Sequence, residues 1–258
     1  ITQIWRRAGV VTAISAEQVA LAHRTMPDLP LVTIPNGVDT NAFVPATRNS
    51  GRPFTMICVA RLIERKGQHQ LLQAFANLRA ANHEPMALIF VGTGDAEPQL
   101  RELAAKLQVA EAVTFKGFVP RENMPPVYHD ADVFVLPSQH EGMSIALLEA
   151  MASGLPVIVT DTGGTAELVT QGANGEIVPW DDVEALTTAL QRLLNAAEQR
   201  RRMGDESRRR ALAFGWPTLA ARYLELCARV MVPSAESRAK DARSAKNVAR
   251  DWTRELRG

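Results

Sequence analysis

The chain has 258 residues, of which 46% are hydrophobic and 22% are charged, an ordinary composition for a globular protein. A formal net charge of +1 argues against nucleic acid as the main partner. No apolar run reaches the roughly 18 to 20 residues that a membrane-spanning helix requires. Cys58 and Cys227 lie far apart in patterns typical of core residues, so we expect them to be reduced. We therefore expect a cytoplasmic protein, with contact to the inner face of the membrane left open.

The first part of the chain contains two strand patterns around one helix. Residues 10–15 predict a strand, and Ser15 is placed to cap a helix over 16–25. A second strand over 31–34 leads into P-N-G-V-D, in which Asn36-Gly37 indicates a turn. Residues 42–53 hold two prolines and little periodicity, which is typical of a linker.

From Phe54 onward, apolar strand patterns alternate regularly with helix patterns. We expect strands over 54–60, 86–91, 112–116, 132–136 and 156–160. We expect helices over 68–81, 97–108, 123–129, 144–153 and 165–171, further polar helices over 181–213, and a last amphipathic helix after F-G-W-P. This alternation predicts an α/β fold with a doubly wound parallel sheet, and apolar strands such as A-L-I-F-V fit burial on both faces.

The stretch 137–149 reads P-S-Q-H-E-G-M-S-I-A-L-L-E and joins an apolar strand to an apolar helix. Glu149 has apolar neighbours on nearly every side, so its carboxylate should be buried and needs a hydrogen-bond donor. A core arginine would meet that need, and so would a ligand. In open parallel sheets, ligands bind at the carboxyl ends of the strands, which favours a ligand here.

The sequence from Glu141 to Glu149 resembles the E-x7-E signature of family 4 glycosyltransferases, which are retaining enzymes of the GT-B fold. The resemblance implies that Glu141 contacts the donor sugar and that Glu149 binds the ribose of the nucleotide. It also implies that the amides between them meet the sugar and the diphosphate, namely those of Gly142, Met143, Ser144 and Ile145. Met143 and Ser144 depart from the aromatic residue and glycine frequent in the family, which leaves the identity of the sugar open.

A pair of cations follows the first strand of the alternation. In A-R-L-I-E-R-K-G, Arg61 ends the strand and Lys66 precedes a helix, so the two can converge on one anion. The family holds the donor diphosphate with an R-x4-K pair at this place, which implies the same role here. Glu64 and Arg65 lack that support and are expected at the surface.

These cations would stabilise the charge on a departing diphosphate, so we expect no metal. Asp130-Ala131-Asp132 spells the D-x-D metal motif of another glycosyltransferase fold. Because it precedes a strand, we interpret it as polarity between a helix and that strand.

Three more turns continue the resemblance. Gly92 and Gly94 follow the second strand, but Glu97 stands where a dinucleotide fingerprint needs a third glycine. The two glycines either let the backbone approach the donor, as in the family, or simply allow a tight turn. F-K-G-F-V matches the family turn that faces the nucleobase, which implies a contact by Val119. In G-G-T-A-E, we expect Glu167 to seat its own turn.

The resemblance runs from about Val10 to Met231 and implies a domain plan. The expected parts are a remnant of an N-terminal acceptor domain with the hinge over 1–44, a nucleotide-sugar-binding Rossmann-like domain over 45–214, a crossover helix over 215–232 and a polar basic tail over 233–258. On this comparison, most of the N-terminal domain is absent. The first segment and the last helix would then expose an apolar patch, which predicts a homodimer or a partner chain.

We therefore expect a retaining glycosyltransferase that uses no cofactor. It would move a sugar from a nucleoside diphosphate sugar, a UDP-sugar by default, to a carbohydrate or lipid-linked acceptor. Two alternatives stay open. One is an incomplete nucleotide-sugar-binding module that acts with a partner chain, and the other is a nucleotide-sugar 2-epimerase.

Overall fold

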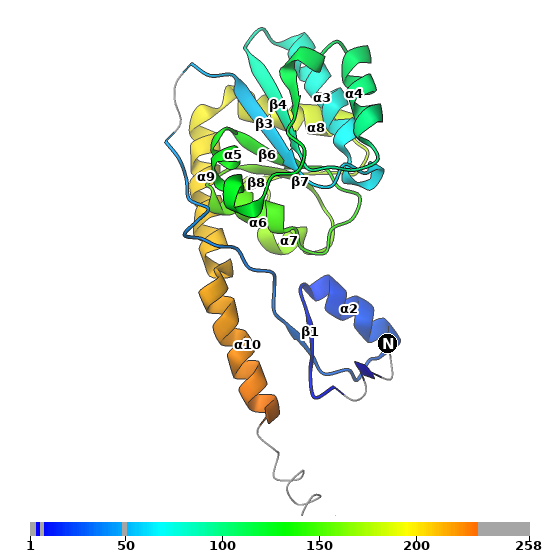
Figure 1. The fold of residues 1–258 in the computed structure, drawn as a ribbon, viewed down its shortest axis with the longest axis vertical. Helices are drawn as coiled ribbons and strands as arrows, with labels where there is room; N and C mark the ends of the chain where they lie inside the picture. The colour runs from blue at the N-terminus through cyan, green and yellow to red at the C-terminus, as the bar shows by residue number, and fades with distance from the viewer. Residues whose placement is uncertain (1–3, 6–7, 48–50, 232–258) are drawn as a thin grey trace, which may run out of the picture.

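Six parallel strands form one sheet in the computed structural model, which describes residues 4–5, 8–47 and 51–231 (Figure 1). The strands are β3 (Phe54–Val59), β4 (Met86–Val91), β5 (Val113–Phe115), β6 (Val133–Leu136), β7 (Val157–Thr160) and β8 (Gly175–Val178). Their order across the sheet is β5-β4-β3-β6-β7-β8, and every neighbouring pair is parallel. The chain winds outward from β3 on one side and from β6 on the other. The doubly wound fold expected from the sequence is confirmed.

Helices surround this sheet, and most begin within a residue or two of the predicted positions. They are α3 (Gln68–Ala81), α4 (Glu97–Lys106), α5 (Met124–His129), α6 (Ile145–Ala152), α7 (Thr165–Leu168), α8 (Val183–Asn195) and α9 (Ala197–Ala211). α3 packs against α4 and α8, and α6 packs against α9. The prediction missed β8, because it contains Gly175 and Glu176, which are depleted in strands. Gly175 is required there, since a Cβ would lie 2.3 Å from the carbonyl oxygen of Val157.

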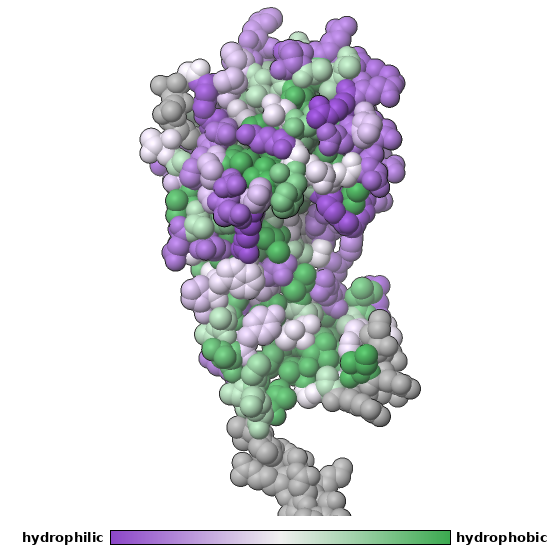
Figure 2. Space-filling view, viewed as in Figure 1, coloured by the Kyte–Doolittle hydropathy of each residue, from purple (hydrophilic) through white to green (hydrophobic). Residues whose placement is uncertain are grey.

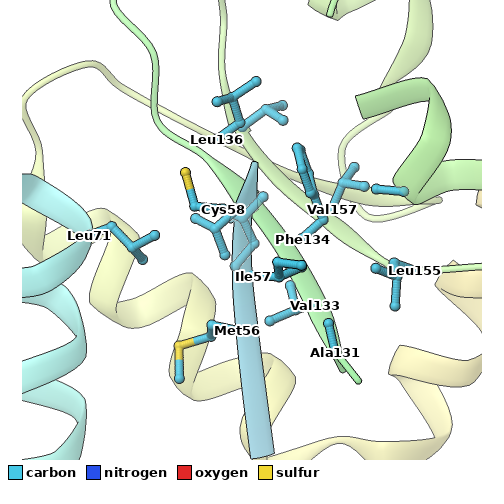
Figure 3. Packing of buried hydrophobic residues seen from close by; sticks show 14 of the residues in the cluster. Met56, Ile57, Cys58, Leu71, Ala131, Val133, Phe134, Leu136, Leu155 and Val157 are labelled. Atoms are coloured by element: carbon cyan, nitrogen blue, oxygen red, sulfur yellow. The ribbon is translucent and has the colours of Figure 1, made fainter. Parts of the chain in front are cut away.

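The central strands are buried on both faces. Figure 3 shows Met56, Ile57 and Cys58 of β3 beside Val133 and Phe134 of β6, all fully shielded from solvent. Burial of a charge is unfavourable and close packing of apolar side chains is stabilising, which explains the apolar runs in the sequence. Within the described part of the chain, no helix is both long enough and apolar enough to cross a membrane.

The N-terminal segment forms a small unit of its own. β1 (Val11–Ala13) and β2 (Leu31–Thr33) pair in parallel, and α2 (Ala16–Thr25) lies between them in the chain. The Ser15 hydroxyl accepts a hydrogen bond from the Gln18 amide at 3.2 Å, as expected of an N-cap. α10 (Trp216–Met231) runs away from the sheet toward this unit (Figure 1). Arg222 on α10 donates to the carbonyl oxygen of Thr33 at 2.8 Å.

Apolar surface gathers over α10 and the unit of β1 and α2, as Figure 2 shows, whereas the sheet domain is mostly hydrophilic on this face. Exposed residues there include Leu21, Leu224 and Met231. Both cysteines are free, but Cys227 lies on this exposed helix, so the expectation that it is a core residue is wrong. The predicted partner and domain boundaries stay predictions, and the predicted tail over 233–258 lies outside the described residues.

Arg208 of α9 ties the linker to the sheet domain. Its guanidinium donates to the carbonyl oxygens of Thr40 at 3.0 Å, Phe43 at 2.7 Å and Ala152 at 3.0 Å. We expect Arg208→Ala to lower the free energy of unfolding by about 2 to 3 kcal/mol, because three carbonyl groups lose a charged donor. Urea denaturation measures this loss. Arg209→Ala removes an exposed pair with Glu206 and should leave stability unchanged, and equal losses in the two variants would contradict the assignment.

Candidate active site

The sheet order creates a switch point between β3 and β6. After β3 the chain turns toward β4, whereas after β6 it turns toward β7, and in open parallel sheets the crevice beside such a switch point is where ligands bind. The loop after β3 contains Arg61 and Lys66, and the loop after β6 contains Glu141. Topology thus brings together two segments that lie about 75 residues apart in the sequence.

The two loops pack backbone against backbone. Gly67 has a φ of +71°, and a Cβ at this position would lie only 2.0 Å from the carbonyl oxygen of Pro137. The Gln139 amide donates to the carbonyl oxygen of Arg65 at 2.8 Å. Only glycine fits this close approach, which places the neighbouring Lys66 side chain beside the loop after β6.

Lys66 and Glu141 form an ion pair between the Nζ atom and Oε1. The Ser138 hydroxyl donates to the same carboxylate oxygen at 2.7 Å. The two charged side chains are only 13% and 12% exposed, so both are largely shielded from solvent. Two of the three predicted catalytic residues therefore meet directly, and Ser138 is a site residue that the sequence did not reveal.

Arg61 stands at the solvent-facing edge of the same crevice. The Gln68 side chain donates to the carbonyl oxygen of Arg61 at 2.8 Å, which fixes the backbone. The exposed guanidinium forms no ion pair with any described residue. It therefore remains available to an anion. Glu64 and Arg65 are exposed, as expected of surface residues.

Glu149 is buried inside α6, as its apolar neighbours predicted, with 6% of its surface exposed. The Tyr128 hydroxyl donates to its Oε2 at 3.0 Å, and the Nε of Arg121 lies 3.9 Å from Oε1. Burial raises the pKa of Glu149, while the tyrosine and the arginine lower it. The required donor is thus a tyrosine. In the sequence, Tyr128 has only the pattern of a core aromatic residue.

The loop that begins α6 turns its carbonyl groups toward the protein. The carbonyl of Gly142 accepts from Gly164 at 2.7 Å, and that of Met143 accepts from the Asn36 side chain at 2.9 Å. Ser144 caps α6 by accepting from the Leu147 amide at 3.2 Å. By contrast, the amides of residues 142–145 donate to no described residue. The Met143 side chain is buried in the core.

Gly92 and Gly94 are explained by the adjacent loop. A Cβ at Gly92 would lie 2.1 Å from the carbonyl oxygen of Ala60, and one at Gly94 would lie 2.2 Å from that of Leu62. Close packing against the loop after β3 therefore accounts for both glycines, and their contact with a donor stays a prediction. Val119 is half-buried against the core, in the loop after β5.

The N-terminal unit contacts the same region. The Glu167 carboxylate accepts a hydrogen bond from the Ala16 amide at 2.7 Å, at the start of α2. Glu167 therefore fastens the N-terminal unit rather than its own turn, which corrects our expectation. Asn36 reaches the Met143 carbonyl from the same unit, although the sequence marked it only as a turn residue.

Asp132 lies at the opposite edge of the sheet from the crevice. Its carboxylate accepts from the Thr55 amide at 2.9 Å and from Arg52 at 3.1 Å. Among the described residues, no group of three or more histidine, cysteine, aspartate or glutamate side chains is placed to hold a metal ion. The Asp132 side chain of the D-x-D sequence thus has a structural explanation.

Known proteins resemble this chain over most of its length. It is 35% identical over 244 residues to the GDP-mannose-dependent alpha-(1-6)-phosphatidylinositol monomannoside mannosyltransferase of Mycolicibacterium smegmatis, which covers 88% of this chain and 64% of the relative. It is 32% identical over 213 residues to the D-inositol 3-phosphate glycosyltransferase of Corynebacterium urealyticum, with 76% and 50% covered. The chain thus spans less than two thirds of these relatives.

Solved structures share the fold. Sucrose-phosphate synthase from Thermosynechococcus elongatus superposes with a TM-score of 0.81 at 28% identity, over 90% of this chain and 61% of that one. Anabaena Alr3699/HepE in complex with UDP gives 0.80 at 24% identity, over 89% and 66%. Residues 39–210 match the family model for glycosyl transferases group 1. The chain therefore belongs to the group 1 glycosyl transferases, and its sheet domain is the Rossmann-like domain of a GT-B glycosyltransferase.

Proposed function

We propose that this chain binds a nucleoside diphosphate sugar for a retaining glycosyltransferase of family 4. The observation that carries the proposal is the meeting of Arg61, the Lys66–Glu141 pair and the α6 loop at one switch point. A free cation, unused amides at a helix start and a carboxylate in one crevice suit a diphosphate attached to a sugar.

Each side chain has a place in this reaction. The acceptor hydroxyl attacks the anomeric carbon while the bond from that carbon to the diphosphate oxygen breaks. The hydroxyl proton passes to the leaving phosphate, so no enzymatic nucleophile is needed. Arg61 and Lys66 stabilise the charge that builds on the diphosphate. Glu141 accepts hydrogen bonds from the sugar hydroxyls, and Glu149 accepts them from the ribose.

For the donor base, we place guanosine ahead of the uridine default. The mannosyltransferase at 35% identity is named as GDP-mannose-dependent. The structure with UDP is 24% identical and supports the fold alone. Arg61 and Lys66 supply positive charge for the diphosphate, so we propose a metal-independent reaction.

The acceptor lies beyond this site. The N-terminal unit reaches the α6 loop through Asn36, which supports acceptor contacts on that side of the crevice. A relative that acts on a phosphatidylinositol mannoside supports a lipid-linked acceptor and contact with a membrane surface. The exposed apolar surface of α10 supports the module that acts with a partner chain as the second candidate.

Calorimetric titration with GDP, UDP and ADP tests the donor site. We expect one nucleotide to bind, and Glu149→Ala to weaken that binding at least about tenfold, because a buried acceptor for the ribose is lost. Glu64→Ala, on the exposed rim of the β3 loop, is the matched control and should bind normally. A folded chain that binds none of the three nucleotides would overturn the proposal.

A further inference from the structure

Tyr128 is a buried residue that contacts the Glu149 carboxylate. Its side chain is fully buried, and its hydroxyl lies 3.0 Å from Oε2 of Glu149 and 3.2 Å from the carbonyl oxygen of Ala146. The residue belongs to α5, whereas Glu149 and Ala146 belong to α6. The contact therefore joins two helices that approach the crevice from different parts of the sequence.

The tyrosine ring is held from two sides. Phe43 of the linker meets it edge to face, with ring centroids 5.8 Å apart. Phe134 of β6 lies at 6.5 Å on a tilted ring. Aromatic packing of this kind fixes the ring plane and therefore the position of the hydroxyl. The single hydroxyl proton of Tyr128 is thus held between the Ala146 carbonyl oxygen and one oxygen of Glu149, which is the nearer and the charged acceptor.

The two oxygens of Glu149 consequently differ. Oε2 is occupied by the tyrosine hydroxyl, whereas Oε1 faces the exposed Arg121 at 3.9 Å, beyond hydrogen-bond distance. Oε1 therefore keeps its capacity to accept hydrogen bonds. A carboxylate that was free to rotate would lose this distinction.

We infer that Tyr128 is a positioning residue for nucleotide binding, which fixes the Glu149 carboxylate so that Oε1 stays a hydrogen-bond acceptor for the ribose. This inference rests on the proposed donor site. Tyr128 itself touches no ligand in this account and acts only through Glu149.

The groups around the Glu149 carboxylate determine how nucleotide binding should depend on pH. Burial raises the pKa of Glu149, whereas the Tyr128 hydroxyl and the Arg121 guanidinium lower it. Cys58 of β3 faces Tyr128, but burial raises the pKa of its thiol to about 12, so it is neutral below that pH. Removing the hydroxyl should therefore raise the pKa of Glu149 further. The protonated acid then forms at a higher pH and accepts fewer hydrogen bonds.

Tyr128→Phe tests this inference, because phenylalanine retains the ring packing. We expect the dissociation constant of the bound nucleotide, GDP or UDP, to rise about twofold at about pH 8 and about tenfold at about pH 5.5, relative to the unchanged chain. Dividing the dissociation constant of the variant by that of the unchanged chain at each pH removes the effect of protonation of the nucleotide itself. Tyr223→Phe makes the same chemical change on the exposed helix α10 and should give a ratio near one at both pH values.

A loss in Tyr128→Phe that is equal at both pH values would overturn the inference, since it would indicate a purely structural role. A direct readout needs no ligand. Carbon-13 NMR of the glutamate carboxyl groups, with Glu149 assigned by its absence in Glu149→Gln, should show a higher pKa for Glu149 in Tyr128→Phe. An unchanged pKa contradicts the inference, whereas a chain that binds no nucleotide but shows the shift contradicts only the proposed donor site.

Discussion

Arg61→Ala should weaken the binding of a nucleoside diphosphate about tenfold to a hundredfold and leave the stability of the chain unchanged. The Arg61 guanidinium is exposed and forms no ion pair with a described residue, so its removal breaks nothing in the unliganded structure. Its loss removes one charge-assisted contact to phosphate, which accounts for the expected magnitude. Calorimetric titration measures the affinity, and thermal unfolding measures the stability.

Two controls make this result specific to the diphosphate. Arg65 lies in the same loop and is also exposed, and its carbonyl group accepts a hydrogen bond from the Gln139 amide. Arg65→Ala should therefore bind the diphosphate normally. The free nucleoside, which has no phosphate, should bind Arg61→Ala and the unchanged chain equally. Equal losses in both arginine variants would mean that general positive charge, and not a site at Arg61, attracts the nucleotide.

Gly67→Ala should lower the free energy of unfolding by about 3 kcal/mol or more and also abolish nucleotide binding. Two costs add at this position. The left-handed backbone, with φ at +71°, disfavours a side chain, and the new Cβ would meet the Pro137 carbonyl oxygen at 2.0 Å. The loops after β3 and β6 must then separate, which moves Lys66 away from Glu141. Urea denaturation and titration together measure the two effects.

Gly117→Ala is the control that separates the cost of a positive φ from the cost of a steric clash. Gly117 has nearly the same φ, +69°, but nothing lies within 4 Å of an added Cβ. Its replacement by alanine should lower the free energy of unfolding by only about 1 kcal/mol, because only the backbone conformation is disfavoured. If the two variants lost the same stability, the close approach of the two loops would carry no energy, and the account of how the crevice is assembled would fail.

The sequence predicted those features that depend on local patterns. The Ser15 cap and the helix over 68–81 appear as expected, because capping and helix periodicity are local. β8 was not predicted, because it contains a glycine. The need for this glycine is visible only in the folded sheet, where the neighbouring strand leaves no room for a Cβ. The meeting of Lys66 with Glu141 follows from topology, since parallel strands present their following loops at one edge.

Other site residues could not be found in this way, because packing alone gives them their partners. Tyr128 contacts Glu149 from a separate helix and stands in no recognisable motif, whereas Ser138 lies three residues before Glu141 in the same loop and has no assigned role in the motif. Glu167 was assigned to its own turn, yet it fastens the distant start of α2. Long-range hydrogen bonds of this kind leave no periodic trace in the sequence.

The most direct test of the donor site is a crystal structure of this chain with the nucleoside diphosphate that titration selects. We expect the diphosphate within hydrogen-bond distance of Arg61, Lys66 and the amides of residues 142–145, with the ribose at Oε1 of Glu149. A nucleotide bound elsewhere, for example in the cavity of about 540 Å³ between α3 and α4 that Ile63, His69 and Leu100 line, would contradict this account.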